Sequence, residues 1–186
     1  MTQQTLSLAL SPSRTLRMAI GAIVFAIATA VSAKVQVILP MTPVPFTFQP
    51  LLVVLAGALL GARLGAASQV LYLTAGILGV PAFAFGGGAA YLLGPTGGYL
   101  LAYPLAAAVA GALVGGSLLR IFGGMLAGVA VIYAGGLLWL AALYGTGAVL
   151  ALGLTPFVLA DLVKVVVGTA VVRQFRTTTL RLFGGR

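Results

Sequence analysis

The chain has 186 residues, of which 61% are hydrophobic and 6% are charged, and its mean hydropathy is +1.20. A soluble globular domain is excluded, because so few charged side chains cannot cover its surface, and the chain is expected in a lipid bilayer. A nucleic-acid partner is excluded despite the net charge of +9, since the basic residues are spread singly and form no basic face.

The residue types that the sequence lacks exclude most catalytic chemistry. It contains no cysteine and no histidine, which excludes disulfides, thiolate chemistry, imidazole catalysis and Cys/His metal sites. A single carboxylate side chain, Asp161, excludes paired-carboxylate hydrolysis and carboxylate-rich metal sites. No GxxxxGK[ST] motif occurs, so the chain has no P-loop with which to hydrolyse ATP. We therefore expect no enzyme, no catalytic residue, no metal site and no cofactor.

Six apolar segments follow one another along the chain, each long enough or nearly long enough to cross a bilayer as a helix. They run over residues 17–33, 50–60, 66–79, 99–119, 121–144 and 155–173. The second and third are short, so we expect their helices to extend beyond these bounds. Thr155 is expected to cap the last helix, with Pro156 at its first helical position. The predicted fold is an all-α integral membrane protein, a compact bundle of six transmembrane helices over residues 17–175.

The remaining segments are polar or irregular, and residues 1–186 are expected to form a single membrane domain. Residues 1–16 are a polar N-terminal segment without a convincing signal-peptide cleavage site, and residues 176–186 are a basic tail. Long connections rich in Pro or Gly follow the first, third and fifth spans, at residues 34–50, 80–98 and 145–154. Irregular backbone this apolar is tolerated at a membrane only where it is buried in protein or lines a cavity.

The basic residues predict the orientation of the bundle. Eight arginines fall on the side of the membrane that both termini share: Arg14, Arg17, Arg63, Arg120, Arg173, Arg176, Arg181 and Arg186. Lys34 alone falls on the opposite side, and Lys164 lies within the membrane. Because Lys and Arg are enriched in cytoplasmic loops, we expect a multi-pass protein of the inner (cytoplasmic) membrane with both termini in the cytoplasm and the long loops outside.

Asp161 and Lys164 are the only charged residues inside an apolar segment. Their i, i+3 spacing places them on one helix face, in the outer half of the membrane. A charge near the bilayer centre costs about 2.5–3.5 kcal/mol, so the pair needs an explanation. It is either a structural pair that fixes helix packing or a recognition site. In a recognition site, Asp161 would accept from ligand N–H groups and Lys164 would donate to a ligand oxygen, which suits an amide- or urea-like head.

Further candidates for ligand contacts lie in the outer loops. The polar ones, each of which could equally be a cap or turn residue, are Thr47, Gln49, Thr96 and Tyr99. The aromatic ones, which could wall an apolar pocket, are Phe46, Phe48, Phe83, Phe85 and Tyr91. Lys34 could meet a ligand carboxylate or be an ordinary interfacial lysine. On the first span, Ala22, Ala26 and Ala30 form a small-residue stripe that lets helices approach closely, either within this chain or against a partner membrane subunit.

Four sequence motifs resemble the BioY family, the substrate-binding membrane S-components of biotin transporters of the energy-coupling factor (ECF) type. They are PVPFTFQ at 43–49, LYLTAGILGVPAFA at 71–84, GPTGGYL at 94–100 and DLVK at 161–164. The resemblance covers about residues 17–175, with the motifs in the expected order and spacing.

The resemblance implies a six-helix protein that captures biotin from outside with high affinity, for uptake across the membrane. It implies three kinds of partner: biotin, a membrane-embedded coupling subunit, and two cytosolic ATPase subunits. By motif match, Asp161 and Lys164 would contact the ureido ring of biotin, and Ala22, Ala26 and Ala30 would form the docking face for the coupling subunit. The loop at 80–90 offers no amide or charged side chain, so any polar contact from it would come from backbone.

Two other classes of function stay open from the residues alone. A stand-alone, proton-coupled secondary transporter of a small solute bearing a urea or amide would use Asp161 as its proton carrier, although the sequence lacks the repeated, interrupted helix pairs often found in such proteins. An intramembrane enzyme or assembly factor is disfavoured, because one Asp and one Lys provide few candidate catalytic residues.

Overall fold

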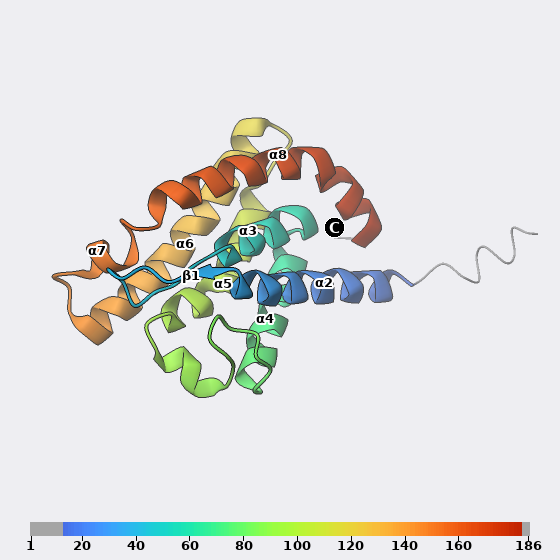
Figure 1. Cartoon of the computed structure of the whole chain (residues 1–186). Coiled ribbons are helices and arrows are strands. Elements are labelled where there is room, and N and C mark those ends of the chain that lie inside the picture. The colour runs from blue at the N-terminus through green and yellow to red at the C-terminus, as the bar shows by residue number, and fades with distance from the viewer. Residues whose placement is uncertain (1–12, 184–186) are drawn as a thin grey trace, which may run out of the picture.

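The computed structural model describes residues 13–183, which fold into a helical bundle with long loops at one end (Figure 1). The elements in chain order are α2 (Arg14–Lys34), β1 (Gln36–Val37), β2 (Phe46–Thr47), α3 (Gln49–Leu60), α4 (Ala62–Ile77), η1 (Ala89–Leu93), α5 (Gly97–Leu113), α6 (Leu118–Tyr144), α7 (Val149–Gly153) and α8 (Val158–Phe183). The helices α2 to α6 and α8 follow the order of the six predicted segments. The two short strands, an addition to the predicted all-α fold, pair antiparallel in the loop between α2 and α3, which we call the first outer loop after its predicted side of the membrane.

The junction between α5 and α6 differs from the prediction. α5 ends at Leu113 and α6 begins at Leu118, so Arg120 lies in the first turn of α6. The side chain of Ser117 accepts a hydrogen bond from the backbone N–H of Arg120 at 3.3 Å and caps α6. Hydropathy does not reveal the break between Leu113 and Leu118, because the sequence on both sides of it is apolar.

Both ends of the last helix also differ from the prediction. α8 begins at Val158, and Thr155 does not cap it. The Thr155 hydroxyl instead donates to the carbonyl oxygens of Leu150 and Ala151, and so belongs to the end of α7. At its other end α8 continues ten residues past the predicted limit, to Phe183, since no Gly or Pro interrupts residues 174–183.

The extension of α8 is fastened to the ends of two neighbouring helices. Nε of Arg176 donates to the carbonyl oxygen of Ala58 at 3.0 Å, and its Nη2 donates to that of Val114 at 3.1 Å. The Thr179 hydroxyl donates to the carbonyl oxygen of Leu59 at 3.0 Å. These side chains satisfy carbonyl groups that the C-termini of α3 and α5 leave without helical partners.

The short helix α3 lies at the centre of the bundle, in contact with α2, α4, α5, α6 and α8. Nine of its 12 residues are buried, as expected of a helix that is apolar on all sides. Its polar residue is Gln49, at the end where the outer loops gather. The centre of the bundle therefore delivers an amide side chain to the loop end of the molecule.

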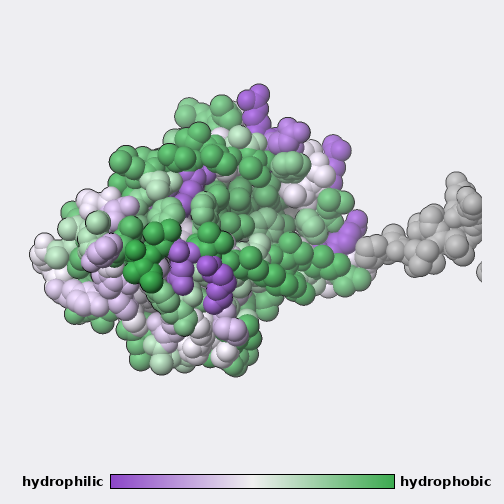
Figure 2. Space-filling model, viewed as in Figure 1, coloured by the Kyte–Doolittle hydropathy of each residue, from purple (hydrophilic) through white to green (hydrophobic). Residues whose placement is uncertain are grey.

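The exterior is apolar, as a membrane protein requires. Among the described helices, α2 and α6 are both long and apolar enough to cross a membrane, and α3 and α5 are shorter apolar helices. The outward side chains of α2 include Ile23, Ile27 and Val31, which are 46%, 57% and 61% exposed. Figure 2 shows hydrophobic residues over most of one face, with several strongly hydrophilic residues along the end where α8 finishes. A bundle with so apolar a surface is suited to lipid and not to water.

The beginning of α2 and the end of α8 lie at the same end of the bundle (Figure 1). Phe183 packs there with Met18 and Ala22. Ala22 and Ala26 are themselves buried, and Ala30 is partly buried against the core around Tyr72. Two of the three alanines of the stripe therefore pack within this chain, and its role as a docking face for a partner subunit stays a prediction.

Candidate functional site

The polar centre of the molecule lies where the start of α8 faces α6 and the loop before α3. Asp161 and Lys164 occupy the first two turns of α8, and both are buried. Oδ1 of Asp161 accepts a hydrogen bond from Nζ of Lys164 at 2.7 Å, which confirms that the i, i+3 spacing brings the two charges together.

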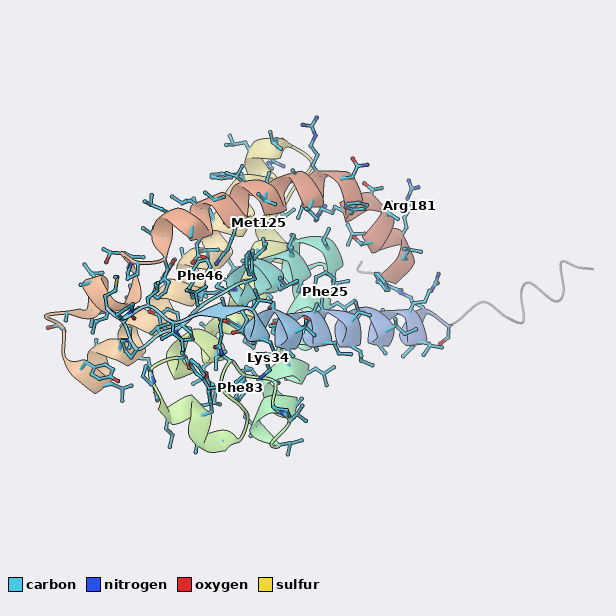
Figure 3. The ribbon with its side chains drawn as sticks, viewed as in Figure 1. Phe25, Lys34, Phe46, Phe83, Met125 and Arg181 are labelled. Carbon is cyan, nitrogen blue, oxygen red and sulfur yellow. The ribbon has the colours of Figure 1, made fainter. Side chains whose placement is uncertain are left out.

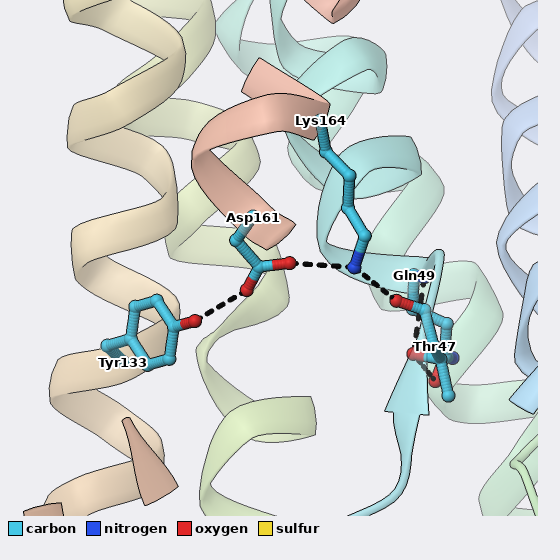
Figure 4. A network of polar contacts seen from close by, with 5 residues as sticks. All are labelled: Thr47, Gln49, Tyr133, Asp161 and Lys164. Atoms are coloured by element: carbon cyan, nitrogen blue, oxygen red, sulfur yellow. Dashed lines mark hydrogen bonds and ion pairs between the residues drawn. The ribbon is translucent and has the colours of Figure 1, made fainter. Parts of the chain in front are cut away.

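Two neighbouring elements hold this ion pair in place (Figure 4). The Tyr133 hydroxyl on α6 donates to Oδ2 of Asp161 at 2.6 Å, and Nζ of Lys164 donates to the carbonyl oxygen of Thr47 on β2 at 2.7 Å. The network thus joins α6, α8 and the first outer loop. Charge-assisted hydrogen bonds of this length are the strong ones, so the pair has a defined geometry before any ligand arrives.

Aromatic rings complete the surroundings of the ammonium group. Nζ of Lys164 lies 3.8 Å from the centre of the Phe46 ring and 5.4 Å from that of Phe48. A ring face attracts a cation within about 6 Å, so both rings help to hold the ammonium group in place.

A second polar group continues from Thr47 into the core. Nε2 of Gln49 donates to the Tyr72 hydroxyl at 2.6 Å, and the backbone N–H of Gln49 donates to the Thr47 hydroxyl at 3.3 Å. Tyr72 stacks on Tyr103, with ring centres 6.2 Å apart. Both tyrosines lie in the middle of helices, so this wall of the site is built on rigid elements.

These groups line a cavity that is partly open to the surface. Like many ligand pockets in proteins, it is mostly apolar with a few convergent polar groups. The lining residues are Val44, Pro45, Phe46, Thr47, Gln49, Pro50, Ala84, Tyr91, Thr96, Tyr99, Leu100, Tyr103, Ile132, Tyr133, Phe157, Asp161 and Lys164. The cavity is therefore mostly apolar, and its charged, hydrogen-bonding groups are Asp161 and Lys164.

Six of the seven predicted ligand-contact residues line this cavity: Asp161, Lys164, Gln49, Thr47, Thr96 and Tyr99. The seventh, Phe85, does not, and it is 56% exposed. The backbone between Phe83 and Gly86 forms a tight turn with reciprocal hydrogen bonds, which turns Phe83 into the core and Phe85 out. Its neighbour Ala84 takes the predicted place in the wall.

Of the other predicted aromatic residues, two line the cavity, one lies in the core, and Phe48 does neither and is 41% exposed. Phe46 and Tyr91 line the cavity, whereas Phe83 is fully buried and stacks on Tyr91 with ring centres 4.9 Å apart. Tyr99 lines the cavity with its ring, while its hydroxyl donates to the carbonyl oxygen of Gly153 at 2.8 Å and ties α5 to α7.

Lys34 has a structural partner in this conformation. Its Nζ donates to the carbonyl oxygen of Phe83 at 2.6 Å, and Figure 3 shows the two residues together at the end of α2. Nε2 of Gln36 donates to the carbonyl oxygen of Ala84 at 3.3 Å. The end of α2 and the start of the first outer loop thus hold the second outer loop, and Lys34 does not line the cavity.

Sequence reasoning missed Tyr133 and Tyr103. Tyr133 lies in the middle of the span predicted over residues 121–144, away from the membrane interface where tyrosine is common. A polar side chain at that depth usually faces the bundle interior, and this signal could have found Tyr133. Tyr103 lies near the start of the span predicted over residues 99–119, where this signal does not apply.

The arrangement suits the binding of a small polar group. Within residues 13–183, no three His, Cys, Asp or Glu side chains gather to hold a metal ion. The charged groups neutralise each other and retain hydrogen-bonding capacity toward the cavity, which suits recognition of a neutral polar head group.

Comparisons with known proteins agree with this geometry. The profile of the BioY family matches residues 2–181. The probable biotin transporter BioY of Pyrococcus horikoshii is 39% identical over 156 residues, covering 83% of this chain and 93% of the relative. The biotin transporter BioY of Thermotoga maritima is 35% identical over 165 residues, covering 87% and 96%. A crystal structure of the S-component for biotin from an ECF-type ABC transporter has the same fold, with a TM-score of 0.80 over 90% of this chain and 95% of that one, at 22% identity.

Proposed function

The chain belongs to the BioY family, and we propose that it captures biotin as the substrate-binding component of an ECF-type transporter. The observation that carries the proposal is the buried pair of Asp161 and Lys164 in the wall of a mostly apolar cavity. It is a transport function and not an enzymatic one.

The unused hydrogen-bonding capacity of the pair matches a ureido group. A carboxylate has about four acceptor sites, and Asp161 uses one for Lys164 and one for Tyr133. An ammonium group has three hydrogens, and Lys164 gives one to Asp161 and one to the carbonyl of Thr47. Two acceptor sites and one donor therefore have no hydrogen-bond partner among the described residues, although the Phe46 ring lies 3.8 Å from Nζ. They are the complement of the two N–H groups and one carbonyl of a cyclic urea.

The apolar remainder of biotin has a matching surface. Its sulfur-containing ring and hydrocarbon chain would lie against Phe46, Ile132 and Phe157, which line the same cavity. Burying apolar ligand area contributes about 25 cal/mol per Å², so these walls would supply much of the affinity while the polar end sets the specificity. In this arrangement Gln49, Thr96 and Tyr99 would border the ligand.

The proposed assembly with other subunits follows from the absence of an ATP-hydrolysing motif in this sequence. Because it carries no P-loop, ATP-driven uptake requires other subunits: a membrane-embedded coupling subunit and two cytosolic ATPase subunits. The proposed topology is six spans in the inner (cytoplasmic) membrane, with both termini in the cytoplasm and the cavity opening outward. It is supported by the distribution of the arginines and by the shared end at which α2 begins and α8 finishes.

The proton-coupled alternative is not favoured. Asp161 would have to lose its charge during each cycle, which would leave the ammonium of Lys164, 2.7 Å away, without a compensating charge inside the membrane. Uptake into vesicles without any ATPase, collapsing with the proton gradient, would support that alternative.

Titration calorimetry of the purified protein with biotin tests the proposal. We expect saturable binding of biotin, and much weaker binding of an analogue whose urea carbonyl is removed to leave a diamine. A biotin Kd no tighter than about 1 mM, which corresponds to only about 4 kcal/mol, would contradict the function.

A further inference from the structure

The charged groups of the cavity lining are confined to one ion pair. Among its lining residues, Asp161 and Lys164 are the only ionisable acid and base, and they lie 2.7 Å apart as a neutral pair. Every other lining side chain is apolar, a hydroxyl or an amide. A ligand with a carboxylate at its far end therefore meets no free cation from this wall.

Lys164 cannot serve both ends of such a ligand. Two of its three hydrogens are engaged with Asp161 and with the carbonyl of Thr47. The third is required by the ureido carbonyl if the ligand enters in the orientation proposed above. In the inverted orientation a ligand carboxylate would approach Lys164 beside the carboxylate of Asp161, and the repulsion between the two anions opposes that pose.

The other cations of the described chain are placed elsewhere. Lys34 is the nearest one along the outer loops, and its ammonium is bonded to the carbonyl of Phe83 outside the cavity lining. Arg176 lies at the opposite end of the bundle, where it holds the C-termini of α3 and α5. Figure 3 shows Arg181 far from Lys34 and Phe46, at that same end.

The outward side of the cavity offers neutral hydroxyl groups in place of a cation. Tyr91 and Thr96 line the cavity, are only partly buried, and come from the second outer loop. Tyr103 lies deeper, and within the described part of the chain none of these three hydroxyls has a hydrogen-bond partner. A hydroxyl can donate to a carboxylate, an amide oxygen or an ester oxygen alike.

We propose that this protein recognises its ligand from the ureido end and accepts neutral derivatives of the carboxyl end, so that its ligand class includes biotin amides and esters as well as biotin. The proposal rests on the proposed function and deepens it. If a cationic side chain bound the ligand carboxylate, the amide derivative would lose that charge-assisted hydrogen bond. Its affinity would then be about tenfold to a hundredfold lower than that of biotin. A site of neutral hydroxyls keeps its hydrogen bonds, and affinity should change by less than about fivefold.

The test is calorimetry of the purified full-length protein with three compounds: biotin, biotinamide and the biotin diamine that lacks the urea carbonyl. Biotinamide within about fivefold of biotin, together with loss of the diamine, supports the proposal. Biotinamide weaker than biotin by more than that factor overturns it and leaves the biotin function intact. Failure of biotin itself overturns the proposed function and this inference together.

Lys34→Gln provides a second measurement that does not depend on the absolute affinity. If Lys34 only tethers the second outer loop, the substitution changes the Kd of biotin and of biotinamide by the same factor. A selective loss of biotin affinity, with biotinamide unchanged, would mean that Lys34 swings from the carbonyl of Phe83 to read the carboxylate, and the proposal would be wrong.

Discussion

The Tyr133 hydroxyl on α6 donates to Oδ2 of Asp161 on α8 across 2.6 Å, while the other carboxylate oxygen of Asp161 binds Lys164. This contact fixes the rotation of the carboxylate and leaves its remaining lone pairs available to a ligand. It also joins two long helices at the cavity wall. Tyr133 is thereby a positioning residue for the carboxylate that we propose reads the ureido N–H groups.

We expect Tyr133→Phe to weaken biotin binding by about 1 kcal/mol, roughly fivefold, because the carboxylate loses one of the two groups that orient it. Titration calorimetry measures the change. Tyr144→Phe is the matched control, since Tyr144 lies exposed at the end of the same helix, and it should leave the affinity unchanged. Equal affinities for the two variants would show that Tyr133 does not orient Asp161 for binding.

Substitutions of the ion pair separate recognition from helix packing. Asp161→Asn and Lys164→Ala should each weaken biotin binding by about 1–3 kcal/mol or more and lower the melting temperature, because each leaves a buried partner unpaired. The double variant Asp161→Leu with Lys164→Met replaces the pair by apolar side chains of similar size. It should regain much of the lost melting temperature and yet fail to bind biotin.

Binding by that double variant, or single variants that lose stability but keep their affinity, would assign the pair a structural role alone. The comparison needs both calorimetry and thermal unfolding on the same preparations.

The helices and the ion pair could be predicted because both follow from local rules. Backbone in lipid must satisfy its own hydrogen bonds, so an apolar run becomes a helix, and an i, i+3 spacing puts Asp161 beside Lys164. The partner Tyr133 is 28 residues away in sequence, so its contact depends on how α6 packs against α8. No local pattern encodes that distance.

The loops and the small-residue stripe could not be predicted for a related reason. Phe83 and Phe85 are the same residue type, two positions apart in one apolar segment. The turn between Phe83 and Gly86 places Phe83 in the core and leaves Phe85 exposed. Ala22 and Ala26 would suit an internal or an external helix contact equally, and the side that α2 turns toward α3 and α4 decides between them.

Gly57 on α3 packs directly against the backbone of Ala107 on α5, and its substitution tests that packing. A Cβ added there would lie 1.9 Å from the carbonyl oxygen of Ala107, so Gly57→Ala must push the two helices apart. We expect a loss of about 1–3 kcal/mol, seen as a lower melting temperature in detergent. Gly123→Ala is the control, since an added Cβ on that exposed residue of α6 meets no atom within 4 Å.

The control should be neutral or slightly stabilising, because alanine favours a helix over glycine by up to about 1 kcal/mol. Similar melting temperatures for the two variants would mean that α3 and α5 are not as tightly packed as the structure has them.

The orientation of the bundle is open to a direct test because the chain contains no cysteine, so one introduced thiol is unique. Gly147 lies exposed in the loop between α6 and α7, and Thr178 lies exposed near the end of α8. In right-side-out membrane vesicles, a membrane-impermeant maleimide should label the Gly147→Cys protein at once. It should label the Thr178→Cys protein only after the vesicles are opened. The physical reason is the charge asymmetry: Arg173, Arg176 and Arg181 flank Thr178, and because arginine is enriched on the cytoplasmic side we expect that end there. The reverse labelling pattern would place the cavity mouth in the cytoplasm, where biotin capture from outside is impossible.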